Sequence, residues 1–105
     1  MEPSELESEI LATLRPAGIS ERLRQVFARG LSAVQIWERL PEATQAALRG
    51  EGEDIVAARR GLDLLARTLV RMSAEGRLRR RRVRYGIVLN TKGMRGMLVD
   101  VYRPA

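Results

Sequence analysis

A run of arginines begins where an amphipathic helix ends, and this junction constrains the fold more than any other part of the chain. Glu75-Gly76-Arg77-Leu78 closes a predicted helix over residues 54–75, and a basic strand starts at once. That strand runs to Leu89, and after a glycine-containing segment (90–96) the chain returns as a second strand over 97–103. The pattern predicts a helix followed directly by a β-hairpin with a long, positively charged tip.

The charge of the chain is divided unequally between its two halves. Residues 1–58 hold 6 arginines and 10 acidic residues, a net charge of −4, whereas residues 59–105 hold 12 arginines, 1 lysine and 3 acidic residues, a net charge of +10. Such a concentration of positive potential favours a polyanion, and nucleic-acid phosphates are the usual partner. The alternative is that the arginines form only a solvated surface, and that 18 arginines against 1 lysine reflect the base composition or growth temperature of the host.

Composition argues against several classes of protein. The 105 residues are enough for one domain with one core. Cysteine and histidine are both absent, which removes disulfides, thiolate metal sites and the commonest general base. The N-terminus is acidic where a secretory signal is basic, and no apolar stretch approaches the roughly 20 residues of a membrane span. We expect a cytoplasmic protein without membrane association, metal, cofactor or catalytic activity.

Apolar periodicity predicts five helices, over residues 4–15, 20–29, 33–40, 42–49 and 54–75. The expected N-caps are Ser4, Ser20, Ser32 and Asp54. The expected buried side chains are Leu6, Ile10, Leu11 and Leu14 in the first helix, Leu23, Val26 and Phe27 in the second, Val34, Ile36, Trp37 and Leu40 in the third, and Ile55, Ala58, Leu62, Leu65, Leu69 and Met72 in the last. Gly61 marks a kink, a break into two helices, or a tolerated glycine that costs about 1 kcal/mol relative to alanine.

The hairpin is expected to have one packed face and one charged face. Because side chains alternate along a strand, Val83 points one way while Arg80, Arg82 and Arg84 point the other. Adjacent arginines repel one another on an exposed strand, and nearby phosphates remove that cost. Val99 and Val101 are the expected inward residues of the return strand.

Two segments of the chain resemble winged helix-turn-helix DNA-binding domains. Residues 30–40 look like the start of the helix-turn-helix pair, and residues 65–78 resemble the recognition helix running into the first strand of the wing. The fold class implied is mainly α (α+β), a winged helix over residues 19–105 with a two-stranded C-terminal wing and an extra N-terminal helix in residues 1–18. The family joins its two key helices by a short turn, whereas residues 41–53 intervene here.

The resemblance implies a sequence-specific, double-stranded DNA-binding protein that regulates transcription, with one helix in the major groove and the wing on the phosphate backbone or minor groove. The residues expected to contact DNA are Arg59, Arg60, Asp63, Arg67 and Arg71 on the helix and Arg79, Arg80, Arg81, Arg82, Arg84, Lys92 and Arg95 on the wing. A homodimer through residues 4–15 is a further expectation, because their apolar stripe lies outside the expected winged core.

Two alternatives stay open at this point. The domain could instead be a protein–protein interaction module in a larger DNA- or RNA-associated assembly, which would expose apolar side chains on its recognition face. RNA binding is the other alternative, and the few aromatic residues of the chain disfavour a single-strand reader.

Overall fold

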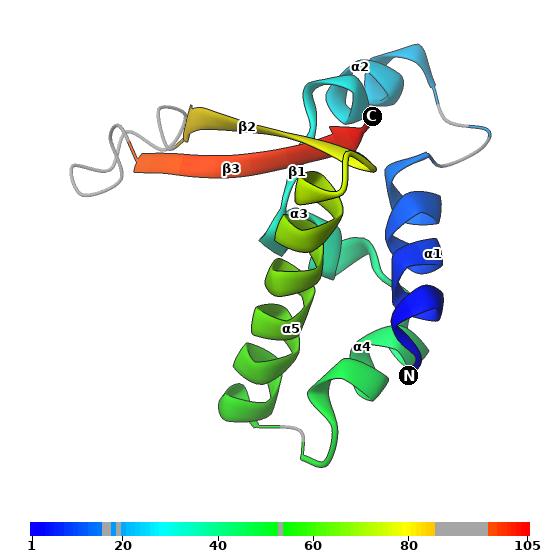
Figure 1. Cartoon of the computed structure of the whole chain (residues 1–105), viewed down its shortest axis with the longest axis vertical. Helices are drawn as coiled ribbons and strands as arrows, with labels where there is room; N and C mark the ends of the chain where they lie inside the picture. Colours follow the sequence, from blue (N-terminus) through cyan, green and yellow to red (C-terminus); the bar gives the residue numbers. More distant parts are fainter. Residues whose placement is uncertain (16–17, 19, 53, 86–96) are drawn as a thin grey trace.

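The computed structural model describes residues 1–15, 18, 20–52, 54–85 and 97–105. This part of the chain is mainly helical with a small antiparallel sheet, as predicted (Figure 1). Its elements are the helices α1 (Pro3–Leu14), α2 (Glu21–Arg29), α3 (Ala33–Arg39), α4 (Glu42–Arg49) and α5 (Ile55–Ala74), and the strands β1 (Leu31–Ser32), β2 (Leu78–Tyr85) and β3 (Met97–Pro104).

The sheet has three strands in the order β1-β3-β2, so the expectation of a two-stranded hairpin alone is wrong. Strands β2 and β3 pair from Leu78↔Pro104 to Tyr85↔Met97, and β1 adds to the other edge of β3 through Leu31↔Tyr102. A strand of two residues is too short to show alternation, so its sequence gave no signal. In Figure 1 the hairpin extends to one side of the molecule, with α2 above it and α5 below.

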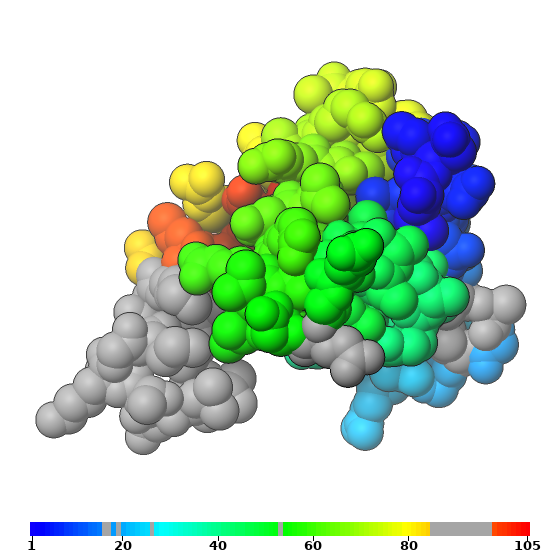
Figure 2. Space-filling view, turned by 90° about the horizontal axis from the view of Figure 1, so that it is seen from below, coloured from blue at the N-terminus to red at the C-terminus, as the bar shows by residue number. Residues whose placement is uncertain are grey.

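Helix α1 belongs to the same hydrophobic core as the rest of the domain. Leu6, Ile10 and Leu14 are buried in one cluster with residues of α3, α5 and the sheet, and Figure 2 shows the atoms of α1 (blue) directly against those of α5 (green). The expectation that this stripe lies outside the core is therefore wrong. A homodimer through residues 4–15 stays a prediction, but it would need side chains other than these three.

Helix α5 is continuous over its 20 residues and begins as predicted. The Asp54 carboxylate accepts a hydrogen bond of 2.9 Å from the Ala57 amide, the expected N-cap interaction. The buried line runs through Ala57, Gly61 and Leu65, whereas Ile55 is 85% exposed, which corrects its predicted place in the stripe. Gly61 is buried because α3 lies close to α5 at this position: a Cβ on Gly61 would be 2.6 Å from the Trp37 ring.

The junction that the sequence singled out is a helix-terminating turn. Gly76 has a φ of +79°, its amide donates to the Ser73 carbonyl at 3.1 Å, and the Arg77 amide donates to the Met72 carbonyl at 2.9 Å. This pair of hydrogen bonds is the Schellman motif, which favours glycine because of its left-handed conformation. Leu78 then enters the core as the first residue of β2.

The remaining helices follow the sequence with local corrections. Ser20 and Ser32 cap α2 and α3 as predicted, but Glu2 occupies the N-cap position of α1 without a side-chain hydrogen bond and Pro3 begins the helix, so the assignment of Ser4 is wrong. Leu23 and Val34 were expected in the core and are exposed. Leu23 lies one helical turn before Phe27, which is only partly buried, so apolar spacing alone does not decide which of these positions is covered.

Candidate nucleic-acid interface

The arginines of β2 divide between the two faces of the sheet. Five of the eight residues of β2 are arginine, and all five side chains are exposed. Leu78 and Tyr102 are buried in the core beside α3 and α5, so the residues that alternate with Leu78 share the α5-side face. These residues are Arg80, Arg82 and Arg84. Arg79 and Arg81 lie on the opposite, α2-side face together with Val83 and Val101.

The prediction that one face packs and the other is charged is therefore wrong, because each face has a packed end and a charged remainder. The alternation itself is as predicted, and Val101 is buried as expected. On the α5-side face the packed end is Leu78 and Tyr102, and the hairpin then continues beyond the helices that cover it (Figure 1). Strand alternation gives the period of two but not the length over which a neighbouring element covers each face.

One of the α5-side arginines, Arg82, forms an ion pair across the hairpin. Arg82 Nε lies 3.2 Å from Asp100 Oδ1, directly across the hairpin. This pair uses one of the five N–H donors of the guanidinium and leaves others for a ligand. Burial raises the pKa of the neighbouring Tyr102 hydroxyl, the negative charge of Asp100 raises it further, and a hydrogen bond from Arg80 opposes both effects. Tyr102 therefore stays a neutral hydroxyl at physiological pH.

The outer face of α5 carries four of the predicted contact residues close together. Arg59, Arg60, Asp63 and Arg67 line a shallow groove of about 310 Å³. Val56 and Leu64 complete its lining. The Arg60 guanidinium reaches the Glu51 carbonyl at 3.5 Å, a long contact that leaves this side chain able to reorient. The groove thus combines basic and apolar side chains on the helix that runs into the wing.

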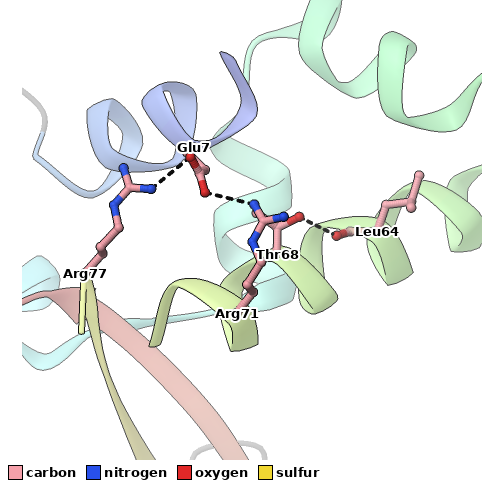
Figure 3. Close-up of polar contacts among 5 residues, drawn as sticks. All are labelled: Glu7, Leu64, Thr68, Arg71 and Arg77. Carbon is pink, nitrogen blue, oxygen red and sulfur yellow. Dashed lines mark hydrogen bonds and ion pairs between the residues drawn. The ribbon is translucent and has the colours of Figure 1, made fainter. Parts of the chain in front are cut away.

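Arg71 lies apart from this groove in an ion-pair cluster with the N-terminal helix. Glu7 of α1 accepts from Arg71 through Oε1 and from Arg77 through Oε2, each at 2.8 Å (Figure 3). The Glu7 side chain is only 16% exposed, and the hydrogen bond from Arg77, followed by the charges of both arginines, lowers the pKa of its carboxyl despite partial desolvation. The cluster joins α1 to the end of α5 and neutralises part of the basic surface.

We predict that Glu7→Gln lowers stability at neutral pH and that this loss disappears in acid. A carboxyl whose pKa is lower in the folded than in the unfolded state stabilises the fold above its unfolded value, and this contribution is lost as the pH falls through the folded value. The difference in unfolding free energy between wild type and variant should therefore be constant from pH 7 to about pH 5 and shrink below about pH 4.3. Urea titrations at each pH measure it.

Glu5→Gln is the matched control for this prediction. It removes a carboxylate from the same helix, but Glu5 is exposed and takes part in no ion pair among the described residues. The control should lose less stability at pH 7 than Glu7→Gln. Equal losses in the two variants would show that helix charge, rather than the cluster, is responsible.

Two of the predicted contact residues, Lys92 and Arg95, lie outside the described residues. Two further arginines, which the sequence did not predict as contact residues, lie beside the predicted arginines of β2. Arg29 at the end of α2 and Arg103 on β3 line the α2-side face together with Arg79 and Arg81. The position of Arg103 on the return strand was the only feature of the sequence that could have identified it as a contact residue. Nothing in the sequence identified Arg29, because α2 is distant from β2 along the chain.

The described residues contain no group of three or more acidic, histidine or cysteine side chains that could hold a metal ion. Within the same residues, no helix is long and apolar enough to cross a membrane. No protein-family model, curated protein or solved structure matches this chain.

Proposed function

We propose that this protein is a sequence-specific, double-stranded DNA-binding protein of the winged-helix type, and that it acts as a transcriptional regulator. The observation that carries the proposal is the arginine content of β2 at the end of α5. Five exposed arginines follow the helix directly, and one of them, Arg82, pairs with Asp100 across the hairpin. A helix followed by a basic hairpin is the outline of a winged helix, and α5, β2 and β3 have this order.

In this proposal the α5 groove faces the DNA bases and the α5-side arginines of the hairpin contact phosphates. Arginine forms bidentate hydrogen bonds with guanine in the major groove, and this pairing is typically worth about 1–3 kcal/mol of discrimination. Contacts with phosphates add affinity for every sequence and make binding depend on salt. Residues 41–53, which separate the predicted helix pair, include the helix α4, which packs against α5.

The proposal is tested by fluorescence anisotropy of a labelled random-sequence duplex at about 50 and 200 mM salt, where phosphate contacts change affinity most clearly. An RNA duplex and a DNA single strand are titrated beside it. We expect binding to duplex DNA that weakens steeply with salt and is weaker for both competitors. No binding to duplex DNA at the lower salt concentration would refute the proposal.

Two single substitutions separate base reading from phosphate binding. Arg67→Ala, in the α5 groove, should change sequence preference in a selection from random duplexes. Arg82→Ala, on the hairpin, should weaken binding to all sequences and lower the salt slope by about 1. Arg39→Ala is the control, because Arg39 is exposed on α3 and lines neither surface. Unchanged affinity, preference and salt slope in both test variants would exclude these two surfaces as the DNA interface.

A specific observation favours a second candidate function, a winged-helix module that binds another protein within a DNA- or RNA-associated assembly. On α5, Val56 is 66% exposed and Val70 is 44% exposed, and Leu64 is exposed between them. Exposed apolar side chains on a recognition face are typical of protein interfaces. Val70→Asp would abolish binding to such a partner, whereas it would weaken DNA binding only modestly through added negative charge.

A further inference from the structure

A second basic groove lies mainly on the α2-side face of the sheet and shares only Arg80 with the surface proposed to read DNA. Arg29 of α2, Arg79 and Arg81 of β2 and Arg103 of β3 line it, with Val101 at its base. Arg80, between two of these residues, completes the lining of a space of about 340 Å³. We call this space the α2-side groove, and its four α2-side arginines are Arg29, Arg79, Arg81 and Arg103. Among the residues that the structure describes, no acidic side chain lines it.

The arginines of the α2-side groove have no ion-pair partner among the residues that the structure describes. The ion pairs of the described residues include Arg24, Arg49, Arg71, Arg77 and Arg82, and none of them involves Arg29, Arg79, Arg81 or Arg103. Arg79 and Arg103 are also directly opposite each other in the β2–β3 register and share one face. Like charges in this arrangement destabilise a sheet, and a bound anion would remove the cost.

The chemistry of the groove fits phosphate better than it fits an acidic protein. Guanidinium groups bind phosphate oxygens in pairs, and alternate strand residues such as Arg79 and Arg81 stand about 6.8 Å apart, which suits a linear chain of phosphates. A protein partner would need an apolar centre to bury, and Val101 is the only apolar residue of the lining.

The groove faces away from α5. Its strand residues alternate with Leu78 and Tyr102, which are buried in the core with Leu69 and Met72 of α5. Figure 1 shows α2 and α5 on opposite sides of the hairpin. A duplex held by α5 and the α5-side arginines would therefore leave the α2-side groove open.

We propose that the α2-side groove binds the phosphate backbone of a second DNA duplex, so that one molecule of this protein bridges two duplexes. This inference rests on the proposed DNA-binding function of the opposite face. It assigns to Arg79 and Arg81 a role separate from that of the α5-side arginines, and it adds Arg29 and Arg103 to the functional residues.

A capture experiment tests bridging. A biotinylated duplex on beads is loaded with the full-length protein and washed, and a fluorescent duplex is then added and the retained fluorescence measured. Anisotropy with one duplex is measured in parallel. We expect wild type to retain the second duplex, and Arg29→Glu and Arg103→Glu each to reduce retention about tenfold while changing the half-saturation for one duplex by less than about threefold, because several phosphate contacts remain on the other face.

Arg39→Glu is the matched control, because Arg39, like Arg29, is an exposed arginine in the last turn of a short helix and the substitution changes the charge equally. It should leave retention unchanged. Arg103→Glu provides a variant that keeps the fold, since a glutamate opposite Arg79 forms a favourable cross-strand pair.

The outcomes separate the two proposals. If both groove variants still retain the second duplex, the inference is overturned. A dimer that bridges two duplexes through its two α5 faces would give this result. Binding of one duplex without retention of a second also overturns it and leaves the proposed function intact. Failure of wild type to bind any duplex refutes the proposed function and the inference together.

Discussion

Replacing Ile10 with alanine is expected to lower the free energy of unfolding by about 3 kcal/mol, since removing a buried isoleucine side chain typically costs about 2–5 kcal/mol. Ile10 is fully buried at the centre of α1, in one cluster with Leu65 and Leu69 of α5. The loss should shift the melting temperature down by about 12 °C or more in a domain of this size. Urea and thermal denaturation, followed by circular dichroism, measure both quantities.

Ile55→Ala is the matched control, because it makes the same chemical change at a side chain that is 85% exposed. It should change stability by less than about 0.5 kcal/mol, as surface substitutions usually do. Ile10→Ala should also unfold in one cooperative transition. A loss below about 1 kcal/mol, or a separate early transition of α1, would show that this helix is an appendage and not part of the core.

The second large effect is expected at Gly61, where alanine should destabilise the fold although it favours the helix. Alanine gains about 1 kcal/mol in helix propensity over glycine. Its Cβ would lie 2.6 Å from one ring atom of Trp37 and 3.3 Å from the Arg49 backbone nitrogen. Overpacking of this kind typically costs about 1–3 kcal/mol, so we expect a net loss of about 1 kcal/mol on denaturation.

The sign of this effect should reverse when the Trp37 ring is made smaller. Trp37→Phe removes the outer part of the indole that the new Cβ would meet. In that background Gly61→Ala should stabilise the protein by less than about 1 kcal/mol, because the gain in helix propensity is then opposed by the close approach to the Arg49 backbone and no longer by the ring. A double-mutant cycle measures the difference. A loss of equal size in both backgrounds would assign the role of Gly61 to some contact other than Trp37.

The local features of the fold could be predicted because each depends on neighbouring residues. Asp54 begins α5 and Gly76 ends it, since a carboxylate satisfies the free amides of a helix start and glycine adopts the left-handed turn that follows a helix. The alternation of β2 side chains between the two faces of the sheet could be predicted for the same reason, because it depends only on the strand itself. For the candidate interface, helical periodicity predicted Arg60, Asp63, Arg67 and Arg71 on one outer face and the family resemblance added Arg59; in the structure Arg59, Arg60, Asp63 and Arg67 line one groove, whereas Arg71 pairs with Glu7.

The contacts between distant segments could not be predicted, because the sequence pattern gives the period of an element and not what packs against it. Gly61 is buried against the Trp37 ring, whereas Ile55, which the periodicity placed in the same stripe, is 85% exposed. Arg71 pairs with Glu7, 64 residues away. Local periodicity carries no information on either contact.

What the sequence by itself determined is the order of the helices and of the hairpin strands, the caps Ser20, Ser32 and Asp54, and the concentration of arginine after α5. Only the tertiary structure decided that α1 completes the core, that β1 joins the sheet and that Arg79 and Arg81 share a groove with Arg29 and Arg103. The physical reason is that capping and alternation act over a few residues, whereas burial and charge depend on which surfaces the folded chain brings together.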